Sequence, residues 1–217
     1  MAFRFGDLSF CFVGGRTVVL DLKRDRYFGV GPEQTRLLRG ALESRDELGL
    51  ANQLIELRLV PEATRHEAFV VLSPCPVRRS AHEDHHGRTG ATFLDATEVI
   101  ALIVATWAAL KFRPLIDVVR NVERRRRKLP GDIDNGSSAQ AATRRFLAVR
   151  GLAPIEPICL LDSLALVAYL ARRGIASDLV LGVDLEPFEA HAWVQHGDCA
   201  LNETAHRAAM LTPILVV

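Results

Sequence analysis

Two segments near the C-terminus decide the fold: CLLDSLALVAYLARRGI at residues 159–175 and LVLGVDLEPFEAHAWVQHGDCALNE at residues 179–203. The first has the apolar run of a helix, which Pro157 precedes and Gly174 ends, as is typical of helix boundaries. The second predicts three strands, residues 177–185, 191–196 and 199–203, because apolar positions alternate and turn residues separate the runs. A helix followed by antiparallel strands predicts an α+β fold.

Three residues in these segments could form a catalytic group. Cys159 is expected at the N-terminus of its helix, where free N–H groups and the helix dipole favour a thiolate. His191 lies on a predicted strand and could act as the base, with Glu203 or Asn202 orienting its ring. A lone cysteine or histidine is more often structural. Their occurrence together and in this order favours nucleophilic catalysis.

These segments resemble the transglutaminase-like, papain-related cysteine peptidases, and in particular the B proteins of lasso-peptide biosynthesis. The resemblance rests on a cysteine at a helix start, a strand with LGV, the HAWV motif and a closing Asn-acid pair, over about the last 75 residues. It implies Cys159 as nucleophile, His191 as base and Glu203 as the acid of a triad. Glu203 stands where the family usually has Asp, so Asn202 remains the alternative partner of His191.

The N-terminal part predicts a small sheet covered by helices. Strands are expected at residues 8–13, 17–22 and 26–30, and helices follow from Pro32 and over residues 46–57. This order resembles the small, winged-helix-like peptide-recognition domains of ribosomal-peptide maturation, which take an extended leader peptide as an added strand. The resemblance implies a leader groove whose residues could equally be the core of a small domain: Tyr27, Phe28, Val30, Leu54, Leu57 and Arg58.

The predicted organisation is a leader-recognition domain (1–72), a linker (73–90) and a cysteine peptidase domain (91–217). The linker carries His82, Glu83, Asp84, His85 and His86, which could bind a metal, although their spacing favours a solvated loop. We therefore predict no metal and no cofactor.

Two further runs have structural interpretations. Residues 99–110, VIALIVATWAAL, lack charge but are too short to span a bilayer, which predicts a buried core helix. The four arginines at 124–127 predict a solvated helix face.

Composition limits the partners and the compartment. The 217 residues are 49% hydrophobic with a net charge of +1, which argues against nucleic-acid binding and against an anionic membrane surface. The four cysteines form no CxxC pair and the N-terminus has no signal-peptide pattern, so we expect a reducing, cytoplasmic location.

The sequence therefore predicts a cysteine peptidase that removes the leader from a lasso-precursor peptide before a separate ATP-dependent cyclase closes the ring. Its expected partners are the precursor peptide and that cyclase. Two alternatives remain open: a thiol acyltransferase of the transglutaminase type, and a non-catalytic leader-binding chaperone.

Overall fold

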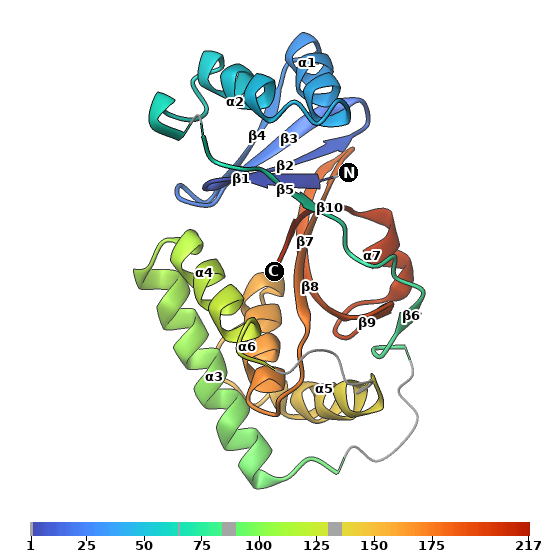
Figure 1. Cartoon of the computed structure of the whole chain (residues 1–217). Coiled ribbons are helices and arrows are strands. Elements are labelled where there is room, and N and C mark those ends of the chain that lie inside the picture. The colour runs from blue at the N-terminus through green and yellow to red at the C-terminus, as the bar shows by residue number, and fades with distance from the viewer. Residues whose placement is uncertain (1, 65, 84–89, 130–135) are drawn as a thin grey trace.

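The N-terminal unit is a five-stranded antiparallel sheet with two helices on one face. The computed structural model in Figure 1 describes residues 2–64, 66–83, 90–129 and 136–217. The sheet has the strand order β4-β3-β2-β1-β5. In chain order, this unit consists of β1 (Ala2–Phe5), β2 (Leu8–Val13), β3 (Arg16–Asp21), β4 (Arg26–Val30), α1 (Pro32–Glu43), α2 (Glu47–Glu56), a 3-10 turn (Glu62–Thr64) and β5 (Val70–Leu72).

The N-terminal sheet has five strands, whereas the sequence predicted a three-stranded, winged-helix-like sheet. The three predicted strands are present as β2, β3 and β4, with the predicted hairpin pairing. Two strands were missed: β1, at Ala2–Phe5, and β5, which begins at residue 70 and pairs with β1. β5 has only three residues, and its partner β1 lies more than sixty residues earlier in the chain. No local sequence pattern therefore predicts it.

Both faces of this sheet are buried, because apolar residues alternate toward each side. Phe3, Phe10 and Val19 face the helices and pack there with Leu38 and other apolar residues of α1 and α2. The other face presents a second set of buried residues, which belong to the core of the C-terminal unit: Ala2, Cys11, Val18, Leu20 and Leu22. The two units therefore share one continuous core.

The C-terminal unit is a mixed sheet packed against helices. The sheet order is β10-β7-β8-β9-β6, and the long hairpin of β7 and β8 reaches up to the N-terminal sheet (Figure 1). The elements are β6 (Arg79–Ser80), α3 (Phe93–Phe112), α4 (Leu115–Arg126), α5 (Gly136–Arg150), α6 (Cys159–Ala171), β7 (Asp178–Leu185), β8 (Phe188–His196), β9 (Cys199–Ala200), α7 (Ala205–Met210) and β10 (Thr212–Val216).

Two predictions for this unit need correction. The segment expected to be a linker contributes β6, which pairs in parallel with β9 and so belongs to the second sheet. The third predicted strand, residues 199–203, is only two residues long, and Asn202 and Glu203 lie in the irregular turn that follows β9. That turn brings both side chains back toward β8.

The glycine of the LGV motif has a steric role. Gly182 on β7 pairs with His191 on β8, and a Cβ atom at position 182 would lie 2.8 Å from the Trp193 ring. Trp193 is buried on the face of the sheet that α7 covers, together with Ala208 and Leu211. Only glycine leaves room for this indole beside the strand that carries His191.

The helix α3 is less buried than its sequence predicts. Thr92 and Asp95 form a capping box at its start, and Val99 and Ile103 lie in the shared core. Its other apolar residues are largely uncovered: within the 18-residue window that is apolar enough for a membrane span, 22% is buried. The expectation of a buried core helix was therefore wrong for most of its surface.

Polar contacts reinforce the junction between the two units. Ser9 Oγ donates to the Ile214 carbonyl at 2.5 Å, which joins β2 to β10, and the Ile116 amide donates to the Leu22 carbonyl at 3.0 Å. Arg120 pairs with Asp7 at 2.9 Å. Because β10, an edge strand of the second sheet, also contacts β1 and β2 of the first sheet, it helps to hold the N-terminal unit in place.

Candidate active site

The helix α6 begins at Cys159, as its sequence predicts. The residue before it, Ile158, offers no side-chain cap, so the N–H groups of the first turn are left without a side-chain partner. Arg150 holds the incoming loop: its guanidinium donates to the Ile155 carbonyl at 3.1 Å and to the Glu156 carbonyl at 3.2 Å. It also pairs with Asp162 in the first turn of α6, at 2.6 Å. The position of Cys159 is thereby fixed on both sides.

Cys159, His191 and Glu203 come together at this helix start. The Cys159 thiol lies close enough to the His191 imidazole that each group shifts the pKa of the other. On the other side of the ring, His191 Nε2 lies 2.6 Å from Glu203 Oε2. Since Nε2 is engaged by the carboxylate, Nδ1 is the nitrogen that remains for the thiol. The His191 and Glu203 side chains are 16% and 14% exposed, so water has little access to their hydrogen bond.

The electrostatics of the three residues favour an ion pair. The hydrogen bond from His191 is the largest influence on the Cys159 thiol and lowers its pKa; burial opposes this, and the amides of Ala192 and Leu160 add to it. The hydrogen bond to Cys159 raises the pKa of His191, with a further contribution from Glu203. Thiolate and imidazolium therefore stabilise each other, which is the charge state that a thiol nucleophile needs.

The carboxylate of Glu203 is kept ionised although burial alone would raise its pKa. The Thr204 amide donates to Glu203 Oε1 at 2.7 Å, and the His191 ring bonds to the other oxygen; together with Arg207 they lower the pKa of Glu203. Arg207 Nε lies 3.9 Å from Glu203 Oε2. The Glu203 side chain therefore reaches the His191 imidazole, as the sequence predicted for the acid of the triad.

Asn202 does not hydrogen-bond to His191, which was the alternative contact that the sequence left open. Its Oδ1 accepts from the Val194 amide at 2.7 Å, and its Nδ2 donates to Ser163 Oγ at 3.0 Å. Ser163 in turn donates to the Ala192 carbonyl at 3.0 Å. Asn202 is thus not the orienter of His191 in this structure, because both ends of its amide bind elsewhere.

These hydrogen bonds form a clamp, which we define as Ser163, Ala192, Val194 and Asn202. Each clamp residue lies close in sequence to a triad member: Ser163 is one turn after Cys159, Ala192 follows His191, and Asn202 precedes Glu203. Sequence reasoning missed Ser163, although its spacing of four from Cys159 placed it on the same face of the helix.

The residues predicted for the leader groove do not share one surface. Phe28 and Val30 on β4 pack toward the helices, whereas Tyr27 points to the opposite face. Leu54 is fully buried between α2 and the sheet, which leaves it no surface for a ligand. Leu57 and Arg58, expected on a helix, lie just past the end of α2, and Arg58 has a positive φ of 55°.

Tyr27 is the predicted groove residue that lies near the candidate triad. Its ring packs against Phe188 with centroids 5.6 Å apart, and Phe188 begins the strand that carries His191. Burial raises the pKa of Tyr27, and Cys159 is close enough to contribute to that shift. Since β4 is the edge strand of its sheet, an edge of the N-terminal unit reaches the catalytic region.

No metal-binding cluster of His, Cys, Asp or Glu occurs among the residues that the structure describes. Of the histidine-rich segment, His82 and Glu83 lie in the turn after β6, whereas Asp84, His85 and His86 fall outside the described residues. The four cysteines are free thiols.

A thiol at a helix start, a histidine on the adjacent strand and an acid behind it form an arrangement that is typical of cysteine enzymes that transfer or hydrolyse acyl groups. The comparison with family models agrees, since residues 99–216 match the transglutaminase-like superfamily. The match covers more than half of the chain, and the protein belongs to that superfamily. Searches of curated proteins and of solved structures found no significant match.

Proposed function

We propose that this protein is a cysteine peptidase that removes the leader from a ribosomally made precursor peptide of the lasso type. The observation that carries the catalytic part is that Cys159 and His191 interact at the start of α6 while Glu203 hydrogen-bonds to the same imidazole. The family supports a cysteine-based enzyme in general, and the choice of peptide substrate rests on the N-terminal sheet and on the sequence resemblance.

The reaction follows from the positions of the three side chains. His191 takes the Cys159 proton, and the thiolate attacks the carbonyl carbon at the end of the leader. The tetrahedral species collapses as His191 donates its proton to the departing amine of the core peptide. Water, deprotonated by His191, then releases the leader carboxylate and restores the thiol. Glu203 keeps the ring oriented and stabilises its charged form throughout.

Recognition of the precursor is assigned to the edge of the N-terminal sheet. A peptide that paired with β4 would gain main-chain hydrogen bonds. It would also lie beside the β7–β8 hairpin, because Tyr27 on β4 contacts Phe188. The shared core holds this edge at a fixed place relative to Cys159, so leader binding raises the local concentration of the scissile bond. The freed core amine would then be the substrate of a separate ATP-dependent cyclase, the second expected partner.

The test is mass spectrometry of the precursor peptide encoded beside this protein. The precursor is incubated with the parent or with Cys159→Ala, each with and without the neighbouring cyclase. We expect a free leader fragment, one water heavier than the acyl group, with the parent alone or with the parent plus cyclase, and none with Cys159→Ala.

Any other outcome of this experiment would support one of the two alternative functions, an acyltransferase or a leader-binding chaperone. A leader joined to an added amine would indicate an acyltransferase. Intact precursor in every reaction, with binding retained by both proteins, would contradict the peptidase proposal and favour a leader-binding chaperone.

A further inference from the structure

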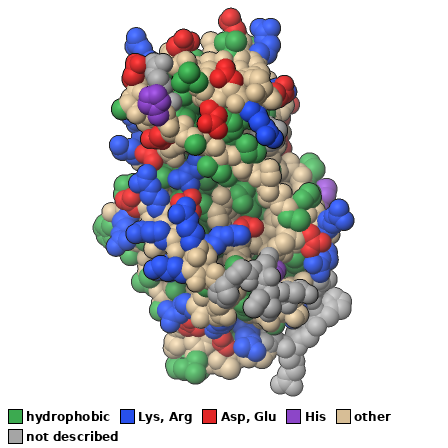
Figure 2. Space-filling model, viewed as in Figure 1, with side chains coloured by type: hydrophobic (Ala, Val, Ile, Leu, Met, Phe, Trp, Pro, Cys, Tyr) green, Lys and Arg blue, Asp and Glu red, His purple; other side chains and the backbone are tan. Residues whose placement is uncertain are grey.

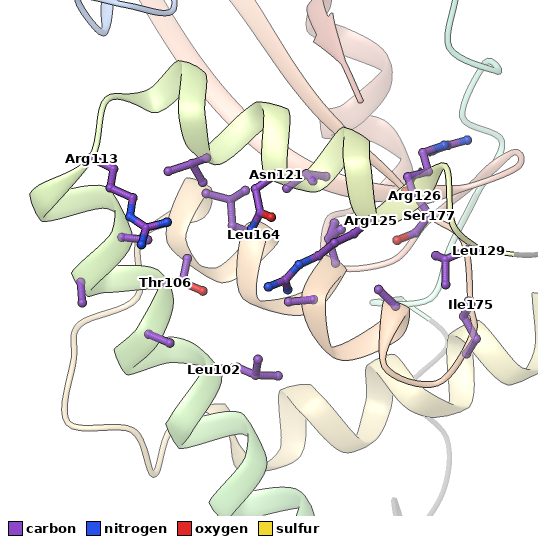
Figure 3. A pocket seen from close by; sticks show the side chains of 18 of the residues that line it. Leu102, Thr106, Arg113, Asn121, Arg125, Arg126, Leu129, Leu164, Ile175 and Ser177 are labelled. Atoms are coloured by element: carbon purple, nitrogen blue, oxygen red, sulfur yellow. Dashed lines mark hydrogen bonds between the residues drawn. The ribbon is translucent and has the colours of Figure 1, made fainter.

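An apolar cavity lies away from the candidate triad, among the helices of the C-terminal unit. It is a groove of about 440 Å³ between α3, α4 and α6, seen from close by in Figure 3. Its walls are mostly apolar, and they include Leu102 on α3, Val122 on α4 and Leu164 on α6. We call this hollow the α3–α4 groove.

The groove exists because small residues line two of its walls. Ala105 and Ala109 on α3 face Ala168 and Ala171 on α6. A closed core at this place would need larger side chains to reach the packing density of protein interiors. The helices are instead held apart with an apolar space left between them.

The uncovered surface extends along the whole of α3. A second hollow of about 560 Å³ shares Leu102 and Ala105 with the α3–α4 groove and continues to Leu94 near the helix start. Leu94 is 76% exposed, and Phe112 at the other end of α3 is 74% exposed. A helix of twenty residues is about 30 Å long, so the surface is far longer than a small ligand would cover.

Two arginines give this surface its charge. Arg113 at the end of α3 and Arg125 on α4 both extend their guanidinium groups over the α3–α4 groove (Figure 3). Neither has an acidic partner among the described residues, whereas the neighbouring Arg126 pairs with Asp178. Figure 2 shows Lys and Arg side chains gathered at the level of α4. An apolar groove below two cations that have no acidic partner in the described part of the chain complements a ligand that is apolar on one face and acidic at its border.

We propose that the α3–α4 groove docks an amphipathic helix of a partner protein, with carboxylates that pair with Arg113 and Arg125. Its apolar face would fill the space beside Ala105 and cover the exposed side of α3. The concave shape favours a helix over a bilayer, because a flat membrane surface cannot fill a hollow between helices. This proposal is independent of the peptidase function, since the groove contains no member of the candidate triad.

The test uses a fluorescein-labelled, helix-stabilised peptide of eighteen residues, with Leu and Ala on one face and Glu at its borders. A matched peptide carries Lys in place of every Glu. Binding to the full chain is followed by fluorescence anisotropy at 50 and 300 mM salt. We expect the Glu peptide to bind at least about tenfold more tightly than the Lys peptide, with affinity falling as salt screens the charges.

Two variants locate the binding site. Arg113→Glu with Arg125→Glu should weaken binding of the Glu peptide at least about tenfold, because attraction becomes repulsion. Ala105→Trp should weaken it by filling the groove from an exposed position. The matched control is Arg16→Glu with Arg36→Glu, the same change of charge at exposed positions on the N-terminal unit, which should leave binding unchanged.

Each variant is first checked for folding by circular dichroism. The proposal is overturned if neither peptide binds, if both bind equally, or if the control pair weakens binding as much as the groove pair. It is also overturned if the parent binds neutral or anionic vesicles in preference to the Glu peptide. Self-association of the parent that Ala105→Trp abolishes would assign the groove to a second copy instead.

Discussion

At the scale of single residues, Glu203 makes the contact with His191 that the sequence predicted for the acid of a triad. Glu203 lies in a turn instead of a strand, so its longer side chain can bend back to His191 Nε2 at 2.6 Å. The sequence left the choice between Glu203 and Asn202 open. Only the positions of the two side chains in the turn resolved it, because the residues are adjacent and both are polar.

Replacing Glu203 by Gln should narrow the pH range of activity. In the parent protein, Cys159 and Glu203 both raise the pKa of His191, so its imidazole stays protonated to higher pH than that of an isolated histidine. Without that charge, the pKa of His191 falls, and the alkaline limb of the activity profile moves to lower pH. We expect precursor cleavage to fall by about 10²–10⁴-fold in kcat/KM.

The measurement is the rate of precursor cleavage between pH 5 and 10 for the parent, Glu203→Gln and Glu203→Asp. Aspartate restores the charge, and we expect it to restore most of the alkaline limb. An alkaline limb that does not move in Glu203→Gln would show that Glu203 has no influence on His191.

The reactivity of Cys159 should report its lowered pKa without any knowledge of the substrate. Alkylation by iodoacetamide follows the thiolate, so its rate should rise with pH through a pKa below the ordinary 9.0. In His191→Ala the hydrogen bond that lowers this pKa is lost while burial, which raises it, remains. The rise should therefore move to higher pH.

Mass spectrometry of the Cys159 peptide measures this rate in a Cys75→Ser background, because Cys75 is the exposed cysteine. Cys11 serves as an internal control, since burial raises its pKa to about 12 and should keep it unreactive. Identical pH profiles with and without His191 would contradict the thiolate–imidazolium pair.

At the scale of elements, the clamp of Ser163, Ala192, Val194 and Asn202 holds α6 against β8 beside the triad. Asn202→Ala would leave the buried Val194 amide without its partner and would remove the hydrogen bond that Ser163 Oγ accepts, at a cost of about 1–3 kcal/mol in the free energy of unfolding. It should also slow alkylation of Cys159, because the helix start moves relative to His191.

Urea unfolding and Cys159 alkylation measure the two effects. Ser163→Ala combined with Asn202→Ala should cost less than the sum of the single changes, because both remove the same hydrogen bond. Ser44→Ala is the control, since its hydroxyl donates to the Gly40 carbonyl on an exposed helix end. Strict additivity of the two changes would show that the clamp does not act as a unit.

At the scale of the whole molecule, the N-terminal unit is not a tethered recognition module but part of the folded core. The lower face of its sheet contributes Leu20, which is fully buried, to the same cluster as Leu166 on α6. Ser9 and Asp7 add polar contacts across the junction. We infer that the two units unfold together.

Leu20→Ala tests this cooperativity, because the only tryptophans of the chain, Trp107 and Trp193, lie in the C-terminal unit. Removing a buried leucine side chain should cost about 2–5 kcal/mol. If the core is shared, the urea midpoint from tryptophan fluorescence should fall together with the midpoint from circular dichroism. Leu37→Ala, at a 53% exposed position on α1, should leave both midpoints nearly unchanged.

An unchanged tryptophan transition in Leu20→Ala would show that the units unfold independently. The proposed coupling of leader binding to catalysis would then depend on a flexible connection instead of a fixed one.

Much of the fold could be predicted from local patterns. The helix start at Cys159, the β7–β8 hairpin and the strands β2, β3 and β4 each carry their own signals of apolar spacing and turn residues. The short strands β1, β5 and β6 could not be predicted in this way. Each is two to four residues long, and β5 and β6 are stabilised by partners more than sixty residues away.

The sequence alone determined the triad candidates Cys159 and His191, their elements and the α+β class, because helix caps and strand alternation are local properties. The tertiary structure decided that Glu203, and not Asn202, meets His191, that both faces of the N-terminal sheet are buried, and that α3 leaves a groove open. These features depend on which distant surfaces meet. Burial and hydrogen bonding at such contacts are set by packing in three dimensions, which no single segment of the sequence encodes.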